Sequence, residues 1–220
     1  NNTITDLTGI EDFAVLESLG TPRSITKLDL SKNITLKTLK CTGTNLTTIN
    51  VTSNKSLINL DCSGSKITTL DLTANLALES LNVNSTQLST VDIQNNTKLI
   101  SLNVGFNQNF KSIDVRKNIN LTTLITFSTS IESLDVSTNT KLTSISAHNS
   151  KLTKLDISNN PLLTSLTCQN NALKSLNLRN GKNTLFSTNL DFKNNPSLTC
   201  IEVDNVSYSD TNWSNYKDVK

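Results

Sequence analysis

The chain has 220 residues, a formal net charge of +2, 4% aromatic residues and no methionine. Lysine and aspartate are mixed along it, so its charge gives no basis for binding nucleic acid or an anionic membrane surface. No apolar run approaches the roughly 18 residues that a membrane-spanning helix needs, so we also expect no membrane insertion. The scarcity of rings and the abundance of Leu, Ile and Val predict a thin core of aliphatic side chains.

Residues 1–20 are predicted to form an N-terminal cap. The opening letters NNTITDL contain neither a basic start nor the apolar core of a signal peptide, so the chain is either cytosolic or a mature or trimmed segment of an exported protein. Thr8-x-x-Glu11 has the spacing of a capping box. One face of a short helix behind it would carry the apolar residues Ile10, Phe13, Leu16 and Leu19.

An apolar triplet then recurs with a period of 21 residues. It begins at residues 28, 49, 70, 91, 113, 134, 155 and 176, and only the step from 91 to 113 has 22 residues. A column of asparagines follows the first seven triplets: Asn33, Asn54, Asn75, Asn96, Asn118, Asn139 and Asn160. This column breaks at Gly181 and is expected to resume at Asn195. A fixed period of this length indicates a solenoid of stacked coils.

A second triplet lies between successive copies of the first. Its seven copies are Leu39-Lys40-Cys41, Leu60-Asp61-Cys62, Leu81-Asn82-Val83, Leu102-Asn103-Val104, Leu124-Ile125-Thr126, Ile145-Ser146-Ala147 and Leu166-Thr167-Cys168. Its surroundings, as in LTSLTCQNNAL, read L-x-x-L-x-[C/V/A]-x-x-[N/T/S]-x-L. This pattern resembles the conserved segment of the leucine-rich-repeat family over about Leu16 to Val206. The 21-residue coil, with Cys in the strand and LDVSxN on the back, is similar to internalins and to leucine-rich segments of secreted bacterial surface proteins.

The resemblance implies a mostly-β repeat solenoid, one structural domain overall, with its coils at 21–206. Each coil would give one front strand to a parallel concave sheet and one short back strand to the convex side. Asparagines of the column would bond free backbone groups at the tight back turns. The strand-side Asn of the family is mostly Thr or Ser here: Thr44, Ser65, Thr86, Thr129 and Ser150.

The four cysteines allow two disulfides, a metal site or no chemistry at all. Cys41, Cys62 and Cys168 share one in-pointing position, with no CxxC spacing and no accompanying His, which argues against zinc. Neighbouring coils bring two of these positions within disulfide range, but side chains on parallel vectors in one sheet suit a bridge poorly. We interpret these three as buried thiols that act as small apolar side chains. Cys200 lies off the column, and the sequence leaves its partner open.

A second column holds aspartates: Asp29, Asp71, Asp92, Asp114, Asp135, Asp156 and Asp191. Calcium would need six to eight oxygen ligands from converging loops, and no such loop is evident. We expect instead a solvated convex ladder, or one paired with hydroxyls such as those of Thr69 and Thr90. No cofactor is predicted.

Catalysis is not expected. His148 is the sole histidine and should face outward, while Cys168 faces inward, so the sheet separates the two groups of a Cys-His pair. No Ser-His-Asp set, Gly-rich phosphate loop or paired carboxylates in a pocket can be assembled from the sequence.

The concave face is where repeat proteins usually bind. Most of its predicted residues are small and polar, such as Asn103 and Ser146, but Phe106, Ile125, Phe127 and His148 should lie together on coils four to six. Clustered aromatic and aliphatic side chains at water-facing positions are typical of a binding hot spot. The 22-residue coil falls beside them, and its extra residue should bulge the loop near Phe106, while Phe110 points inward. Alternatively, a ring folds over the strand edge, or the register slips at the bulge.

Aromatic residues cluster near the C-terminus. Trp213, Tyr208 and Tyr216 lie within the last 13 residues. They are predicted to form a C-terminal cap at 207–220 over otherwise exposed Leu and Val, with a functional aromatic patch as the alternative.

Three functions remain open on this evidence. The leading hypothesis is a monomeric, non-catalytic module that binds a protein ligand on the concave face, for recognition or adhesion, and the second is a glycan-binding module. The third is an inert spacer within a larger surface protein. The resemblance implies an extracellular or cell-surface location.

Overall fold

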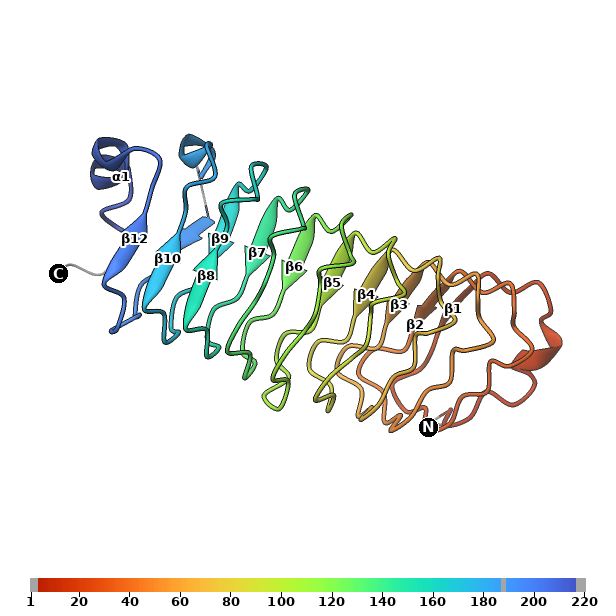
Figure 1. The fold of residues 1–220 in the computed structure, drawn as a ribbon. Coiled ribbons are helices and arrows are strands. Elements are labelled where there is room, and N and C mark those ends of the chain that lie inside the picture. Colours follow the sequence, from red (N-terminus) through yellow and green to blue (C-terminus); the bar gives the residue numbers. More distant parts are fainter. Residues whose placement is uncertain (1–3, 187–188, 217–220) are drawn as a thin grey trace.

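The computed structural model describes residues 4–186 and 189–216, which form a curved stack of coils (Figure 1). Nine front strands make one parallel sheet in the order β1-β2-β3-β4-β5-β6-β7-β9-β11. Their bounds are β1 Ser18–Gly20, β2 Thr38–Lys40, β3 Asn59–Asp61, β4 Ser80–Asn82, β5 Ser101–Asn103, β6 Thr123–Ile125, β7 Ser144–Ser146, β9 Ser165–Thr167 and β11 Asn189–Asp191. The predicted second triplets therefore lie in the front sheet.

Equivalent residues of successive coils form straight rows. Leu39 on β2 is in register with Leu60 on β3, which is in register with Leu81 on β4. The register continues across the 22-residue coil, where Leu102 pairs with Leu124. The extra residue falls in the turn after β5, closed by a bond from the Phe110 N–H to the Asn107 carbonyl at 2.9 Å. Register does not slip at the bulge.

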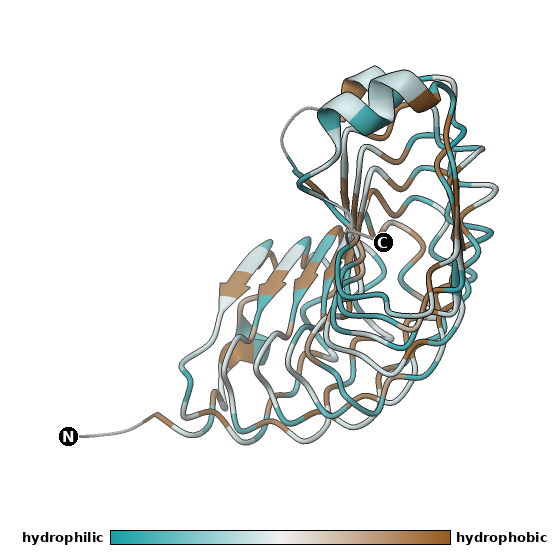
Figure 2. Ribbon diagram, turned by 90° about the vertical axis from the view of Figure 1, so that its left-hand side faces the viewer, coloured by the Kyte–Doolittle hydropathy of each residue, from teal (hydrophilic) through white to brown (hydrophobic). Residues whose placement is uncertain are grey.

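A narrow core runs through the stack. The inward-pointing Leu, Ile and Val side chains of both triplets are buried, or partly buried in the case of Leu28 and Leu70, and the Phe110 ring is fully buried. Figure 2 shows apolar segments recurring at equivalent places in neighbouring coils. One coil alone could not cover these side chains, so the coils stabilise one another.

The convex side differs from the prediction of a short back strand in every coil. Within residues 4–186 and 189–216 a back ladder is present only near the C-terminal end, as a three-stranded parallel sheet of β8 Lys154–Asp156, β10 Ser175–Asn177 and β12 Cys200–Glu202. In earlier coils the back segments share isolated bonds, such as that from the Thr68 N–H to the Thr47 carbonyl at 3.3 Å. The concave sheet sets the strand spacing and the longer convex path spreads the back segments, which works against a continuous ladder.

The N-terminal helix expected from the capping box is a single 3-10 turn, η1 Ile10–Asp12. Gly9, not Thr8, is its N-cap, and the Gly9 N–H donates to Glu11 Oε2 at 2.8 Å. The Thr8 hydroxyl and N–H both donate to Asp6 Oδ1, so they are not available to the turn. Phe13 is 61% exposed rather than packed inward. Leu19 lies in β1, because pairing with β2 extends this segment.

Aromatic residues cover the C-terminal end as predicted. The helix α1, Val206–Asn212, begins at Asn205, whose side chain accepts a bond from the Tyr208 N–H. Trp213 is buried, with its ring 5.9 Å from Phe186 and 6.1 Å from Tyr208 in edge-to-face geometry. A second 3-10 turn, η2 Asn183–Leu185, lies in the irregular stretch before β11. No helix in the described part of the chain is long and apolar enough to cross a membrane.

Candidate binding face

The exposed side of the front sheet is a polar surface. Each front strand from β2 to β11 buries its central Leu or Ile and turns the two flanking residues outward, which follows from the two-residue period of a strand. The central Leu19 of the terminal strand β1 is only partly buried. Over β2 to β6 these residues line a hollow of about 510 Å³. Its outer residues are Thr38, Lys40, Asn59, Asp61, Ser80, Asn82, Ser101, Asn103 and Ile125. Amides and hydroxyls dominate this lining, so it favours neutral hydrogen-bonding groups over charged ones.

Three rings form a row beside this hollow, in the turns that follow β5, β6 and β7. The Phe106 and Phe127 ring centroids are 4.8 Å apart in an edge-to-face contact with an interplanar angle of 80°. Phe127 and His148 are stacked, with centroids 4.7 Å apart and ring planes 5° from parallel. We call Phe106, Phe127 and His148 the aromatic row. It presents a continuous ring surface across three coils.

Phe106 is the most exposed ring of the row, at 55%. Its φ of 54° lies in the left-handed region, which is uncommon for a bulky residue. The same turn position is held by Ser85, Ser128 and Asn149 in neighbouring coils, each at a similar φ. The turn therefore imposes this backbone on whichever residue stands there, and an apolar ring that faces water at such a site gains little from the fold.

His148 is held from two sides. Its Nδ1 lies 3.2 Å from Ser146 Oγ and 3.3 Å from Thr167 Oγ1. The Thr167 hydroxyl donates to Ser146 Oγ at 3.2 Å, so the three side chains form one polar cluster. Burial lowers the pKa of His148, against a smaller opposing effect of Asp191. The lowered pKa favours the neutral form of the imidazole at physiological pH.

The remaining predicted contact residues lie on the adjacent strands. Ile125 on β6 is in register with Asn103 on β5 and with Ser146 on β7. Asn103 Oδ1 accepts a bond from the Gly105 N–H at 3.0 Å, so this amide oxygen is already engaged. Sequence reasoning missed Thr167 as a partner of His148, although its position on the next coil was a usable indication. Gly105, which precedes Phe106, was also given no role.

The back-turn asparagines are buried and bind the coil before their own. Asn54 Nδ2 donates to the carbonyls of Leu30 at 3.0 Å and Asn33 at 2.9 Å, and the same pair of bonds recurs up the stack. Asn195 does not belong to this column, contrary to the prediction. It follows front strand β11 and donates to Cys168 and Phe192 carbonyls on the strand side. The irregular stretch before β11 breaks the 21-residue spacing, so Asn195 falls at a strand-side position of its coil.

Three cysteines are buried under the front sheet. Cys41 Sγ lies 3.0 Å from Cys62 Sγ on the next coil, and all four cysteines, each within the described residues, are free thiols. Their mutual hydrogen bond and burial raise the pKa of Cys62, and burial raises that of Cys168. Cys200 is exposed. Cys62 and Cys168 are therefore neutral thiols, and all three buried cysteines pack as small apolar side chains.

The convex aspartates accept bonds from their own turns. Each binds the N–H two residues ahead, as Asp71 binds Thr73 at 2.9 Å and Asp114 binds Arg116 at 3.1 Å. Hydroxyls at this same position also donate, from Thr73 to Asp71 and from Ser137 to Asp135, each at 2.6 Å. The expected hydroxyl pairing is therefore present in these turns, but not with the Thr69 and Thr90 named as partners. The reason is local, because an Asx turn brings the donor two residues on against the carboxylate.

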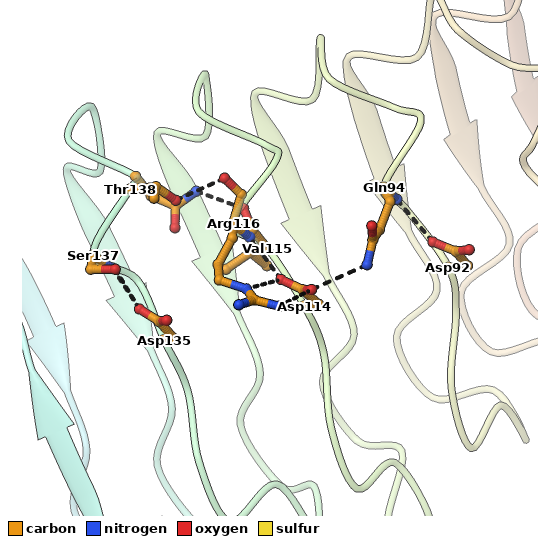
Figure 3. A network of polar contacts seen from close by, with 9 residues as sticks. Asp92, Gln94, Asp114, Val115, Arg116, Asp135, Ser137 and Thr138 are labelled. Atoms are coloured by element: carbon orange, nitrogen blue, oxygen red, sulfur yellow. Dashed lines mark hydrogen bonds and ion pairs between the residues drawn. The ribbon is translucent and has the colours of Figure 1, made fainter.

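Figure 3 shows how neighbouring turns of this ladder are joined. Arg116 pairs with the Asp114 carboxylate at 2.8 Å, and Gln94 reaches the same group at 3.1 Å from the preceding coil. Asp191 departs from the predicted column, because it lies on front strand β11 in register with Thr167. Among the described residues no group of three or more His, Cys, Asp or Glu side chains is placed to hold a metal ion.

The fold is decided by the parallel sheet with one strand every 21 or 22 residues and by its likeness to solved structures. The functional domain of InlJ from Listeria monocytogenes, which includes a cysteine ladder, superposes with a TM-score of 0.78 at 30% identity, over 92% of this chain and 52% of that one. The chain is a leucine-rich-repeat solenoid.

Two other leucine-rich-repeat structures agree. A leucine-rich-repeat protein of Leptospira interrogans matches with a TM-score of 0.67 at 21% identity, over 89% of this chain and 56% of that one. YopM, a leucine-rich effector protein of Yersinia pestis, matches at 0.58 and 25% identity, over 87% and 47%. This leucine-rich-repeat chain spans about half the length of these structures. No protein-family model matches its sequence, and no curated protein does.

Proposed function

We propose that this leucine-rich-repeat chain is a non-catalytic recognition module that binds a protein through its concave face. The aromatic row is its anchor, with Ile125 beside it and the polar hollow of β2 to β6 as the surrounding contact surface. The likeness to a functional domain of InlJ supports an interaction role and a location outside the cell or on its surface. The module acts as a monomer.

The observation that carries this proposal is the exposed, stacked row. Phe106 is 55% exposed although it touches Phe127, and Phe127 is fixed against His148. Rings already held in place lose little conformational freedom on binding, which favours them as anchors. The neutral His148 and the amide-rich hollow indicate a partner segment with an apolar side chain flanked by uncharged hydrogen-bonding groups.

A glycan is the second candidate, favoured by the hollow itself. Its outer residues are mainly Asn, Ser and Thr, and a ring surface for stacking lies at one end. Sugar recognition uses the same pairing of hydroxyl partners with an aromatic platform.

Arrays of extracellular proteins and of glycans test both candidates. The wild-type chain should bind a protein on the first array, and Phe106→Ala should weaken that binding about 30-fold, which corresponds to about 2 kcal/mol for a hot-spot residue. Phe127→Ala should do the same. Phe13→Ala is the matched control, because Phe13 is an equally exposed ring, at 61%, outside the concave face.

The outcomes separate the candidates. Glycan binding that is lost in Phe106→Ala would replace the protein hypothesis with the sugar hypothesis. Binding that survives both substitutions in the aromatic row, with unchanged thermal unfolding, would contradict the site. Absence of any ligand on both arrays would favour a spacer.

A further inference from the structure

Gly105 is a glycine that its backbone does not require. Its φ lies outside the left-handed region, unlike those of Gly9, Gly43, Gly64 and Gly181. A residue with a side chain could therefore adopt its conformation without strain.

Repetition along the stack leads to the same conclusion. The equivalent position in other coils is held by a side chain, namely Thr42, Ser63, Asn84, Phe127, His148 and Gln169. The leucine-rich-repeat coil thus has no general need for glycine here, and the cause must lie in what surrounds this one residue.

The surroundings of Gly105 leave little room for a side chain. A Cβ on Gly105 would lie 3.2 Å from each of three atoms: Asn103 Oδ1, Asn84 Nδ2 and Phe127 Cε1. These separations are shorter than the 3.5–4.0 Å of ordinary carbon contacts. The third atom belongs to the next coil, so the Phe127 ring leans back over Gly105 and occupies the space.

Each of the three neighbours is held in place. Asn103 Oδ1 accepts the Gly105 N–H at 3.0 Å, and the Asn84 amide is engaged through a bond from the Ser85 hydroxyl at 2.7 Å. The Phe127 ring is fixed between Phe106 and His148. A methyl group at Gly105 would require at least one of them to shift by a few tenths of an ångström, at the expense of these contacts.

We propose that Gly105 is the positioning residue of the aromatic row. Its missing side chain leaves the space in which the Phe127 ring lies, and this placement lets Phe127 stack flat on His148 while meeting the edge of Phe106. The consequence for ligand binding rests on the proposed function, whereas the placement of the ring does not.

The sole histidine provides a direct probe of the ring. The His148 Hε1 proton gives the only such signal in the spectrum, because the chain has one His. A phenyl ring stacked at 4.7 Å shifts that signal upfield by its ring current, so the Phe127→Ala variant should move it downfield at a pH where the imidazole is neutral. Gly105→Ala should move the signal in the same direction, and Gly105→Val should move it further.

Two controls keep the result specific. Gly20→Ala adds a methyl group on front strand β1, where nothing lies within 4 Å, and should leave the signal and the thermal unfolding unchanged. In the Phe127→Ala background the substitution Gly105→Ala should produce no additional shift, since the ring that needs the space has gone. A residue with only a general structural role would lower the unfolding temperature and leave the His148 signal in place.

The inference would be overturned if folded Gly105→Ala gave the His148 Hε1 signal at the wild-type position. It would also be overturned if adding Gly105→Ala to Phe127→Ala shifted that signal as far as Gly105→Ala alone does. Failure of the proposed function is distinguishable from this. If Phe106→Ala keeps ligand binding intact while Gly105→Ala moves the His148 signal, Gly105 still positions the row but the row is not the binding site.

Discussion

Replacing one buried asparagine measures how strongly neighbouring coils hold each other. Asn160 is fully buried, and its Nδ2 donates to the carbonyls of Val136 at 3.0 Å and Asn139 at 2.9 Å. Each carbonyl also accepts a backbone N–H, from Asn139 and Leu142 respectively. In Asn160→Ala each would keep one bond, so the loss is about 1 kcal/mol per bond rather than the full cost of an orphaned acceptor. With the small cavity included, we expect the free energy of unfolding to fall by about 2–3 kcal/mol.

Urea titration followed by circular dichroism gives this free energy. The preceding residue is a matched control, because Asn159 is exposed and Asn159→Ala should stay within about 0.5 kcal/mol of wild type. Asn160→Asp should be less stable than Asn160→Ala at neutral pH, since it places a buried carboxylate against two carbonyl oxygens. Equal stability of Asn160→Ala and Asn159→Ala would refute the reasoning that the ladder joins the coils.

Three further predictions concern the thiols, the convex ladder and the C-terminal cap. Of the four cysteines only Cys200 is exposed. A thiol reagent should therefore label one cysteine in the native protein and all four after unfolding. Rapid labelling of two cysteines in the native protein would contradict the burial of the other three. Bonds from Arg116 hold the pKa of Asp114 at about 2 instead of 3.8, so its stabilising effect is present above pH 3.8 and is lost as the pH falls toward about 2. Arg116→Gln should therefore lower stability at neutral pH and change nothing at pH values below about 2, and an equal effect at both would exclude this linkage. Trp213→Ala should cost about 3–5 kcal/mol and increase hydrogen exchange first near α1 and β12, whereas uniform exchange along the whole stack would show that the cap is not local.

The 21-residue period predicted the stacking of the coils better than the position of every single residue. The rows of Leu39, Leu60 and Leu81, and the inward turn of Phe110, follow from counting residues, because strand pairing repeats the same geometry in each coil. Counting residues gave wrong assignments where the 21-residue period is interrupted. The stretch between β10 and β11 shifts the register, and Asp191 and Asn195 were assigned to convex columns although both belong to the concave side.

Two of the other errors have local causes. The capping box at Thr8 was correct in spacing, yet Asp6 takes the bonds of Thr8 and pairing with β2 draws Leu19 into a strand. Propensity is weaker than such tertiary pairing. Hydroxyl partners of the aspartates were sought at Thr69 and Thr90, while an Asx turn places the donor two residues ahead, as Thr73 is for Asp71.

The sequence by itself determined the solenoid, since a 21-residue period of buried leucines admits one way of stacking, and it assigned Phe106, Phe127 and His148 to neighbouring coils. Only the tertiary structure decided how those rings meet. The Phe127 ring leans over Gly105 and stacks on His148 because contacts from three coils meet at one point, and a linear pattern carries no record of the space that one missing side chain leaves there.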